Sequence, residues 1–356
     1  MKSDIVALSE RLIALKTDPD NRKELHKALL LIERELKGFT IERFDKDGCK
    51  SILVHNRKQR PKRFTVLLNG HLDVIPGKDF QYKPVVKGPR LYGVGSMDMK
   101  SNVACLVAAF KDVAHAVEYP LGLQIVTDEE IGGFEGTLHQ IKQGVKADFV
   151  IAGEATQFDI VNQAKGVLWL KVSCKGKTAH GAYPWRGCNA ILEMNAALEE
   201  LLQRFPIPQS QEWVSTVNVS RVETTNASFN KVPDDCSAML DIRFVPKDAK
   251  RILQKVKAAF PKGFTFEVLA QEPALNVPES NHFLQALKAC TEEVTGKEVS
   301  FYGAQGSSDA RHFTRIGCAG VEFGPIGKGI GTDNEWVSIP SLKKYRTILN
   351  RFLLSL

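Results

Sequence analysis

The segment Asn69–Gly77 has the sequence NGHLDVIPG and directly follows the apolar run Phe64–Leu68. A run of this length, bounded by basic residues 62–63 and by a segment containing Gly and Pro, predicts a buried strand. His71 and Asp73 then lie just beyond the carboxyl end of a strand, where open α/β sheets place their functional groups. Imidazole is a common zinc ligand, and its second ring nitrogen usually needs a carboxylate or carbonyl partner. The segment therefore indicates an α/β fold with a candidate metal site at its strand ends.

Helices and strands alternate along the first 165 residues. Apolar periodicity predicts helices over residues 4–16, 22–37, 99–117 and 134–143, and strands over 52–55, 64–69, 121–127 and 148–152. Strands that alternate with helices favour a three-layer αβα domain with a largely parallel sheet.

The pattern changes after about residue 165. The run Gly166–Cys174 alternates apolar and polar residues, as a half-exposed strand does. Further strands are predicted over 213–222, 236–244 and 264–269, with helices over 189–203 and 248–259. Four strands and two helices in this order suit an α+β sandwich with an antiparallel sheet. A helix over 281–295 and a strand over 298–301 then resume the first pattern. We therefore expect an α/β domain, formed by residues 1–165 and 273–356, interrupted by an α+β domain of residues 166–272.

Composition is that of an ordinary globular enzyme. The 356 residues are 43% hydrophobic and 25% charged, with a formal net charge of +7, and they suffice for two domains with sizeable cores. The basic residues are scattered, and the short cluster Arg57–Arg63 is better explained as a solvated loop than as a nucleic-acid patch. We expect a small-molecule substrate and neither a nucleic-acid nor a membrane partner.

The seven cysteines indicate a reducing environment. They form no C-x-x-C pair, and several lie inside apolar patterns, as Cys105 does, so buried reduced thiols explain them better than disulfides or a Cys-zinc site. The N-terminal residues contain no apolar signal core, and no apolar run approaches the length of a membrane span. We expect a cytoplasmic protein.

Acidic residues follow several other predicted elements. Asp98 stands at the entry to the helix over 99–117, Glu129 and Glu130 follow one apolar strand, and Glu154 follows the next. Taken singly, each has a structural explanation, as a helix N-cap, a solvated turn or a loop acid. Together with His71 they occupy strand ends that converge in space, so the group favours metal-assisted hydrolysis.

Such a cluster can hold two divalent ions. Two ions about 3.5–4 Å apart can share a carboxylate and lower the pKa of a water toward about 7. In this scheme His71 and Glu154 hold one ion, Glu130 and a second nitrogen ligand hold the other, and Asp98 bridges them. Glu129 remains free to move a proton from the water to the leaving amine.

These motifs resemble those of the M20 metallopeptidase family, which includes acetylornithine deacetylase and succinyl-diaminopimelate desuccinylase. The matching segments occur in family order across essentially the whole chain: NGHLDVIPG, GVGSMDMKS, TDEEIGG, GEAT, KGKTAHGAYPWRGCNAI and SSDARHF. The resemblance implies a metal-dependent exopeptidase-like catalytic domain whose inserted domain acts as a lid and dimerises. It further implies a homodimeric zinc hydrolase, with cobalt or manganese as substitutes, that cleaves the amide bond of N-acyl amino acids or small peptides.

The resemblance also implies roles for individual residues. The metal ligands would be His71, Asp98, Glu130 and Glu154. Asp73 would orient His71, and Glu129 would be the general base. His180 matches the lid histidine that the family sends across the dimer to the substrate carbonyl, and Asn230 and Arg311 match positions that hold the substrate. A guanidinium is well suited to bind a substrate carboxylate.

One position departs from the family pattern. The last metal ligand of the family is a histidine four residues before a glutamate, and aligned on Asn334-Glu335 this position is Gly331. Three explanations are open: His312 or Asp333 replaces the histidine, the second ion is bound weakly with water in its place, or catalysis has been lost and the chain only binds metal or ligand. We expect one firm metal site built on His71 and a second, compromised site.

Overall fold

The computed structural model describes residues 4–356. The chain forms two compact units. Unit 1 consists of Met1–Gln163, Leu275–Tyr302 and Ser308–Leu356, and unit 2 of Ala164–Ala274 and Gly303–Ser307. The sequence placed the inserted domain at 166–272. In the structure this unit begins two residues earlier, at Ala164, and ends two residues later, at Ala274. Residues 303–307 also belong to it.

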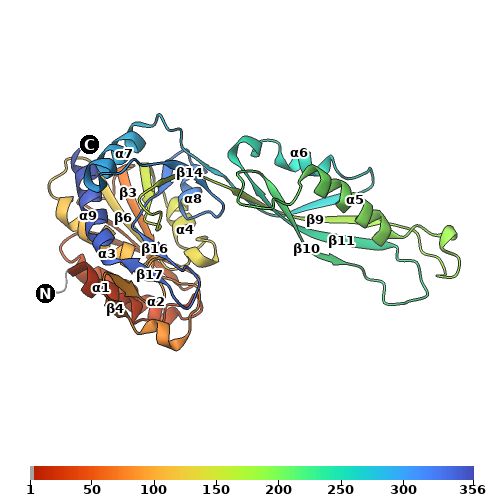
Figure 1. Ribbon diagram of the computed structural model, residues 1–356, viewed down its shortest axis with the longest axis horizontal. Coiled ribbons are helices and arrows are strands. Elements are labelled where there is room, and N and C mark those ends of the chain that lie inside the picture. Colours follow the sequence, from red (N-terminus) through yellow and green to blue (C-terminus); the bar gives the residue numbers. More distant parts are fainter. Residues whose placement is uncertain (1–3) are drawn as a thin grey trace. The chain divides into compact units, whose positions relative to one another are not determined.

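A nine-stranded mixed sheet lies at the centre of unit 1 (Figure 1). Its strands run in the order β1-β2-β6-β3-β7-β15-β8-β13, with β14 paired to β8. The bounds are β1 (Thr40–Lys46), β2 (Cys49–His55), β3 (Phe64–His71), β6 (Leu121–Val126), β7 (Ala147–Ala152), β8 (Ile160–Ala164), β13 (Leu275–Asn276), β14 (Phe301–Ala304) and β15 (Ala319–Glu322). The inner strands β6, β3, β7 and β15 are parallel, so their carboxyl ends share one edge of the sheet.

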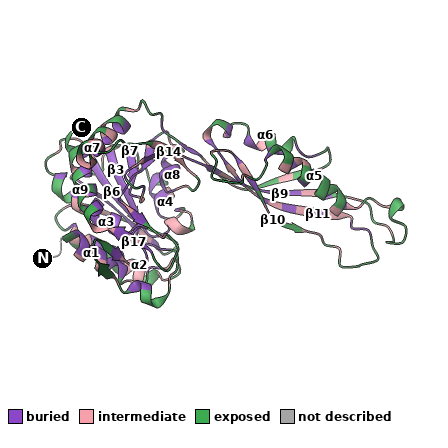
Figure 2. Cartoon of the chain, viewed as in Figure 1, coloured by how far each residue is buried: buried purple, intermediate pink, exposed green. Residues whose placement is uncertain are grey.

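Helices cover both faces of this sheet. One face packs against α1 (Asp4–Ile13), α2 (Arg22–Glu35), α3 (Lys100–Val113), α7 (His282–Thr295) and α9 (Ile339–Leu354), which share the main hydrophobic core with the strands. The other face packs against α4 (Thr137–Lys142) and α8 (Ala310–Thr314) through a smaller core that includes Phe64, Ile141 and Phe313. The inner strands β2, β3, β6 and β7 are almost wholly buried (Figure 2), which explains their continuous apolar runs. The predicted three-layer αβα architecture is confirmed.

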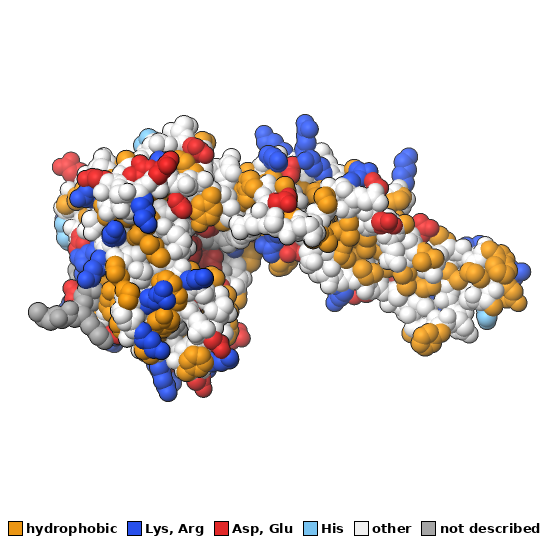
Figure 3. All heavy atoms as spheres, viewed as in Figure 1, with side chains coloured by type: hydrophobic (Ala, Val, Ile, Leu, Met, Phe, Trp, Pro, Cys, Tyr) orange, Lys and Arg blue, Asp and Glu red, His pale blue; other side chains and the backbone are white. Residues whose placement is uncertain are grey.

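Two smaller features complete unit 1. The strands β4 (Val85–Lys87), β5 (Arg90–Tyr92), β16 (Gly327–Lys328) and β17 (Trp336–Ser338) form a separate antiparallel sheet in the order β16-β17-β5-β4. One-turn helices lie at Asp79–Tyr82 and Glu129–Ile131. On the face drawn in Figure 3, basic and acidic side chains are interspersed over unit 1.

Unit 2 is a four-stranded antiparallel sheet with two helices. The strand order is β10-β11-β9-β12, formed by β9 (Gly166–Lys175), β10 (Thr216–Glu223), β11 (Asp235–Phe244) and β12 (Thr265–Glu272). Buried and partly exposed residues alternate along β11 without interruption. The buried face packs against α5 (Ala190–Arg204) and α6 (Ile252–Lys257) in one core, and one-turn helices lie at Pro184–Arg186 and Pro246–Asp248. The predicted α+β unit is confirmed. None of the helices in the described residues is both long and apolar enough to span a membrane.

Candidate metal centre

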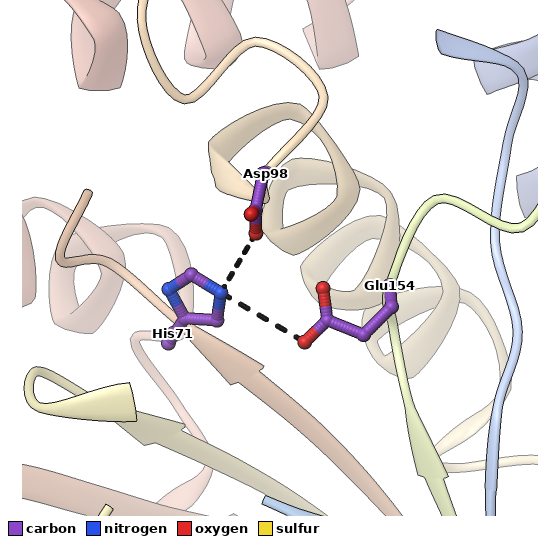
Figure 4. A group of neighbouring side chains, drawn as sticks. All are labelled: His71, Asp98 and Glu154. Atoms are coloured by element: carbon purple, nitrogen blue, oxygen red, sulfur yellow. Dashed lines mark hydrogen bonds and ion pairs between the residues drawn. The ribbon is translucent and has the colours of Figure 1, made fainter. Parts of the chain in front are cut away.

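His71 ends strand β3 and is almost fully buried. Its Nδ1–H donates to the carbonyl oxygen of Asp73, 2.9 Å away, and lies 3.5 Å from Asp73 Oδ1. This bond fixes the ring, so that Nε2 faces the carboxylates of Asp98 and Glu154, at 3.0 Å and 3.8 Å (Figure 4). The structure thus places Asp73 in contact with the Nδ1 side of the His71 ring.

Three residues from separate segments form a group that fits a divalent cation. Asp98 lies just before α3, Glu154 follows β7, and with His71 they offer ligand atoms that all lie within 4.8 Å of one another. One imidazole and two carboxylates are a ligand set that zinc and related divalent ions bind.

The electrostatics of the group support the same conclusion. Burial lowers the pKa of His71, but the hydrogen bonds with Asp73 and Asp98 and the charge of Glu154 outweigh it and hold the pKa well above its ordinary value. Burial, together with the charge of Asp98, raises the pKa of Glu154 well above its ordinary value. The two acids of the group are therefore partly buried beside a single imidazole. A divalent cation would relieve this excess of negative charge.

Glu335 and Asn102 hold the Asp98 segment in place, and the sequence did not reveal either of these roles. The buried Glu335 carboxylate accepts hydrogen bonds from the backbone N–H groups of Gly95, Met97 and Asp98, at 3.0, 2.8 and 3.2 Å. Asn102 Nδ2 donates to the carbonyl oxygens of Met97 and Gly153, at 2.9 and 2.7 Å, and so ties the segment before Asp98 to the residue before Glu154. The one available signal was a polar residue within the apolar stripe of the predicted helix 99–117.

Glu129 and Glu130 lie in the short turn that follows β6. The backbone N–H of Glu130 donates to Asp73 Oδ2 at 2.9 Å, and Glu130 Oε1 accepts from the N–H of Ile75 at 3.1 Å. Burial raises the pKa of Glu130 to about 7 and raises that of Glu129 well above its ordinary value. Within residues 4–356, Glu130 is not part of the group formed around His71.

The space around Gly331, where the family has its histidine, is unobstructed. A Cβ added at Gly331 would meet a single side-chain atom within 4 Å, Ile75 Cδ1 at 3.7 Å, and the N–H of Ile75 is the group that Glu130 accepts from. Neither proposed replacement joins the metal group in the described residues. His312 Nε2 donates to the carbonyl oxygen of Gly132 at 2.9 Å, and the Asp333 carboxylate pairs with Lys78.

The remaining candidates fall in two places. Arg311 lies on α8 in unit 1, where its buried guanidinium donates to the carbonyl oxygens of Gly132 and Ser308, at 2.7 and 2.8 Å. His180 and Asn230 are both exposed in unit 2 and lie on adjoining segments. His180 pairs with the neighbouring Lys231 in an isolated bridge, and the N–H of Gly181 donates to the Asn230 carbonyl oxygen at 2.7 Å.

The fold and this group of residues define a metal-dependent hydrolase. Residues 67–355 match Peptidase family M20/M25/M40, and the chain belongs to this family, as its motifs indicated. Its amide-hydrolase activity and its need for a divalent metal follow from that membership.

Curated relatives are similar over nearly their whole length. The chain is 29% identical to succinyl-diaminopimelate desuccinylase 2 of Ruegeria sp. (strain TM1040), covering 98% of this chain and 94% of the relative. It is also 29% identical to succinyl-diaminopimelate desuccinylase of Dinoroseobacter shibae, covering 99% and 98%.

Solved structures share the fold. Aminopeptidase PepT from Bacillus cereus aligns with a TM-score of 0.80 at 20% identity, covering 99% of this chain and 97% of the other. The M20 family metallo-carboxypeptidase Sso-CP2 from Sulfolobus solfataricus aligns with a TM-score of 0.73 at 17% identity, covering 99% of each chain.

Proposed function

We propose that this chain hydrolyses the amide bond of N-acyl amino acids or small peptides, with a zinc ion held by His71, Asp98 and Glu154. The observation that carries the proposal is the convergence of these three side chains, which come from the end of β3, the loop before α3 and the segment after β7. Cobalt or manganese would suit the same ligands. The ion would polarise the amide carbonyl and lower the pKa of water to near neutrality.

The residues of the chain would supply the proton transfers. Glu129 is partly buried and lies outside this group, so its carboxylate is available to take a proton from the attacking water. It would then deliver that proton to the nitrogen of the leaving amine. Asp73 would keep the Nδ1 proton of His71 in place, so that Nε2 presents its lone pair to the ion.

His180 is the proposed donor to the substrate carbonyl. The N–H of Ala182 donates to His180 Nδ1 at 3.1 Å, so the proton of the neutral imidazole is at Nε2. That N–H would stabilise negative charge as it develops on the carbonyl oxygen. Asn230, which lies beside His180 in unit 2, would contact the same part of the substrate.

We infer that Gly331 leaves the second metal position incomplete. Glu130 would be its only strong protein ligand besides Asp98, and its carboxylate accepts a backbone hydrogen bond. One tightly held ion per chain is therefore the proposed state, with any second ion bound weakly. Glu129, His180 and the complete His71 group favour an active enzyme over a chain that only binds its ligand.

We further propose a cytoplasmic homodimer that assembles through unit 2. All seven cysteines are unpaired, as expected in a reducing compartment. Hydrophobic side chains are spread over the face of unit 2 drawn in Figure 3, and contiguous exposed apolar surface commonly marks a protein interface. The large hydrophobic residues that are exposed in unit 2 are Trp169, Tyr183, Trp185, Leu192, Ile207, Val222, Phe229, Val268 and Leu269.

A hydrolysis panel tests the function. The purified protein, loaded with zinc or cobalt, is assayed against N-acetyl and N-succinyl amino acids and dipeptides, with release of the free amine as the readout. The proposal predicts turnover of at least one substrate class, its loss on chelation and its return on adding metal. Metal binding without turnover of any substrate would instead identify a binding protein.

A further inference from the structure

The turn Glu129–Gly133 carries the proposed general base and is held from outside by helix α8. We propose that Arg311 and His312 are positioning residues that fix this turn through the carbonyl oxygen of Gly132, and so place the Glu129 carboxylate for proton transfer. This inference rests on the proposed function, because it gives Glu129 the role of base.

The hydrogen bonds that the backbone of the turn makes within itself are all local. The N–H of Gly132 donates to the Glu129 carbonyl oxygen at 2.8 Å, and the N–H of Gly133 donates to the Asp128 carbonyl oxygen at 2.7 Å. Gly132 and Gly133 have φ of 114° and 64°, values that glycine adopts without strain. A turn of two adjacent glycines is intrinsically flexible, so its conformation depends on contacts from neighbouring elements.

Two donors from consecutive residues of α8 converge on one carbonyl of this turn. Arg311 Nη2 lies 2.7 Å from the Gly132 oxygen, and His312 Nε2 lies 2.9 Å from it. A carbonyl oxygen has two lone pairs, and both are used here. Because Arg311 is charged, its hydrogen bond is of the stronger, charge-assisted kind.

The Arg311 guanidinium is also committed to other partners. Its Nη1 donates to the Ser308 carbonyl oxygen at 2.8 Å and lies 3.9 Å from Glu129 Oε1. The side chain is only 8% exposed. These contacts use an N–H of each terminal nitrogen, so they hold the buried guanidinium against the turn.

Asp309, two residues before Arg311, packs against the same turn. A Cβ added at Gly133 would lie 1.9 Å from Asp309 Oδ1, so the turn rests directly on that carboxylate. Asp309 Oδ2 in turn accepts from Thr137 Oγ1 at 2.5 Å. The segment Asp309–His312 therefore contacts two successive residues of the turn, which is what positioning Glu129 requires.

Matched variants at His312 give the sharpest test. His312→Gln keeps an N–H donor near the position of Nε2. His312→Phe loses this donor but keeps an aromatic ring beside Phe134, whose ring centroid lies 5.7 Å from that of His312 in the native chain. We expect His312→Phe to lower kcat about 10- to 100-fold with little change in KM, because small displacements of catalytic groups cost this much. His312→Gln should restore most of kcat. Hydrogen exchange of residues 128–136 should become faster in His312→Phe than in His312→Gln.

Arg311→Gln separates positioning from substrate binding. The positioning role predicts the same fold loss of kcat for an N-acyl amino acid and for its carboxamide, together with faster exchange of residues 128–136. The exposed Arg315 directly follows the same helix, and Arg315→Gln should change neither quantity. A rise in KM confined to the carboxylate substrate, with unchanged hydrogen exchange, would overturn the proposal in favour of a substrate anchor.

The exchange measurement does not need activity. If the wild-type protein cleaves no substrate of the panel, the proposed function fails. Faster exchange in His312→Phe and Arg311→Gln would still support the proposal that these two residues fix the turn. If neither variant changes the exchange of residues 128–136, the hold itself is refuted. Should Arg311→Gln not fold, the His312 pair decides alone.

Discussion

His71 owes its orientation to Asp73, two residues further along the chain. The backbone carbonyl oxygen of Asp73 accepts a hydrogen bond from His71 Nδ1–H, and its carboxylate accepts one from the backbone N–H of Glu130. One residue thus sets both the imidazole and the start of the Glu129–Gly133 turn. This is why a histidine and an aspartate two positions apart predict more than a single ligand.

Glu129→Gln tests the general base. The amide cannot accept the proton from water, so kcat should fall at least about 100-fold, within the range that general-base catalysis contributes. Metal content by elemental analysis should be unchanged, because Glu129 lies outside the His71 group. Glu118→Gln, at an exposed position, serves as the control. Near wild-type turnover in Glu129→Gln would refute the assigned role.

At the residue scale, three of the four residues predicted as metal ligands lie in one group in the described residues, but the sequence did not show how they are held. His71, Asp98 and Glu154 could be named because each stands at the end of an apolar run or at the entry to an apolar stripe. The environment of Arg311 could not be predicted, since its partners are backbone carbonyl groups, and these are identical in every sequence. Only the folded chain reveals which carbonyl a side chain meets.

The loop before α3 depends on a carboxylate from the segment just before β17. Glu335→Gln leaves a single acceptor oxygen for three backbone N–H groups and places an amide N–H₂ among donors. Asp98 should then be less well placed, and we expect metal affinity to fall about 10- to 100-fold, as for other outer partners of metal ligands. Competition with a chromophoric chelator measures the affinity.

The neighbouring exposed Asn334 supplies the control for this experiment. Asn334→Ala should bind metal as the wild type does, since its side chain makes none of these contacts. Equal affinity in Glu335→Gln and wild type would show that the carboxylate does not position Asp98.

Helices α3 and α9 are joined by an ion pair that makes stability depend on pH. Asp112 accepts two hydrogen bonds from Arg346, at 2.6 and 2.7 Å, and one from Asn350 at 2.7 Å. The Arg346 guanidinium lowers the pKa of Asp112. A lowered folded-state pKa gives stability that is present above the unfolded pKa, about 3.9, and is lost as the pH falls through the folded pKa.

Asp112→Ala should therefore destabilise the protein at neutral pH. After allowance for solvent screening we expect about 1 kcal/mol in the free energy of unfolding at pH 7, with the difference from wild type shrinking below about pH 4. Urea denaturation at both pH values measures this. Asp79→Ala, which removes an exposed pair with Lys16, should have no measurable effect. A difference that stays constant with pH would contradict the electrostatic origin.

At the element scale, long periodic segments were predicted better than short ones. The helix expected over 99–117 is α3, and the strand expected over 64–69 is β3, each within a few residues. The helix expected over 248–259 is shorter, and the strand expected over 298–301 begins at Phe301. Strands β1 and β8 were missed, because β1 is a partly exposed edge strand and β8 is a short segment without clear periodicity.

For the whole molecule, the central expectation is that each active site needs two chains. If His180 of the partner subunit serves the site that contains Glu129, mixing inactive Glu129→Gln and His180→Ala chains creates one complete site in each mixed dimer. Random exchange should restore about a quarter of wild-type activity. A mixture as inactive as its components, although mass analysis shows exchanged dimers, would place both groups in one chain.

Metal stoichiometry tests the account most directly. Calorimetric titration of the metal-free protein with zinc should give one tightly bound ion per chain. Tight binding should be lost in His71→Ala. In Gly331→His, where a side chain has room but φ is +66°, the number of tight ions should rise towards two. Two tight ions in the wild type, or tight binding that survives in His71→Ala, would contradict a single firm site built on His71, Asp98 and Glu154.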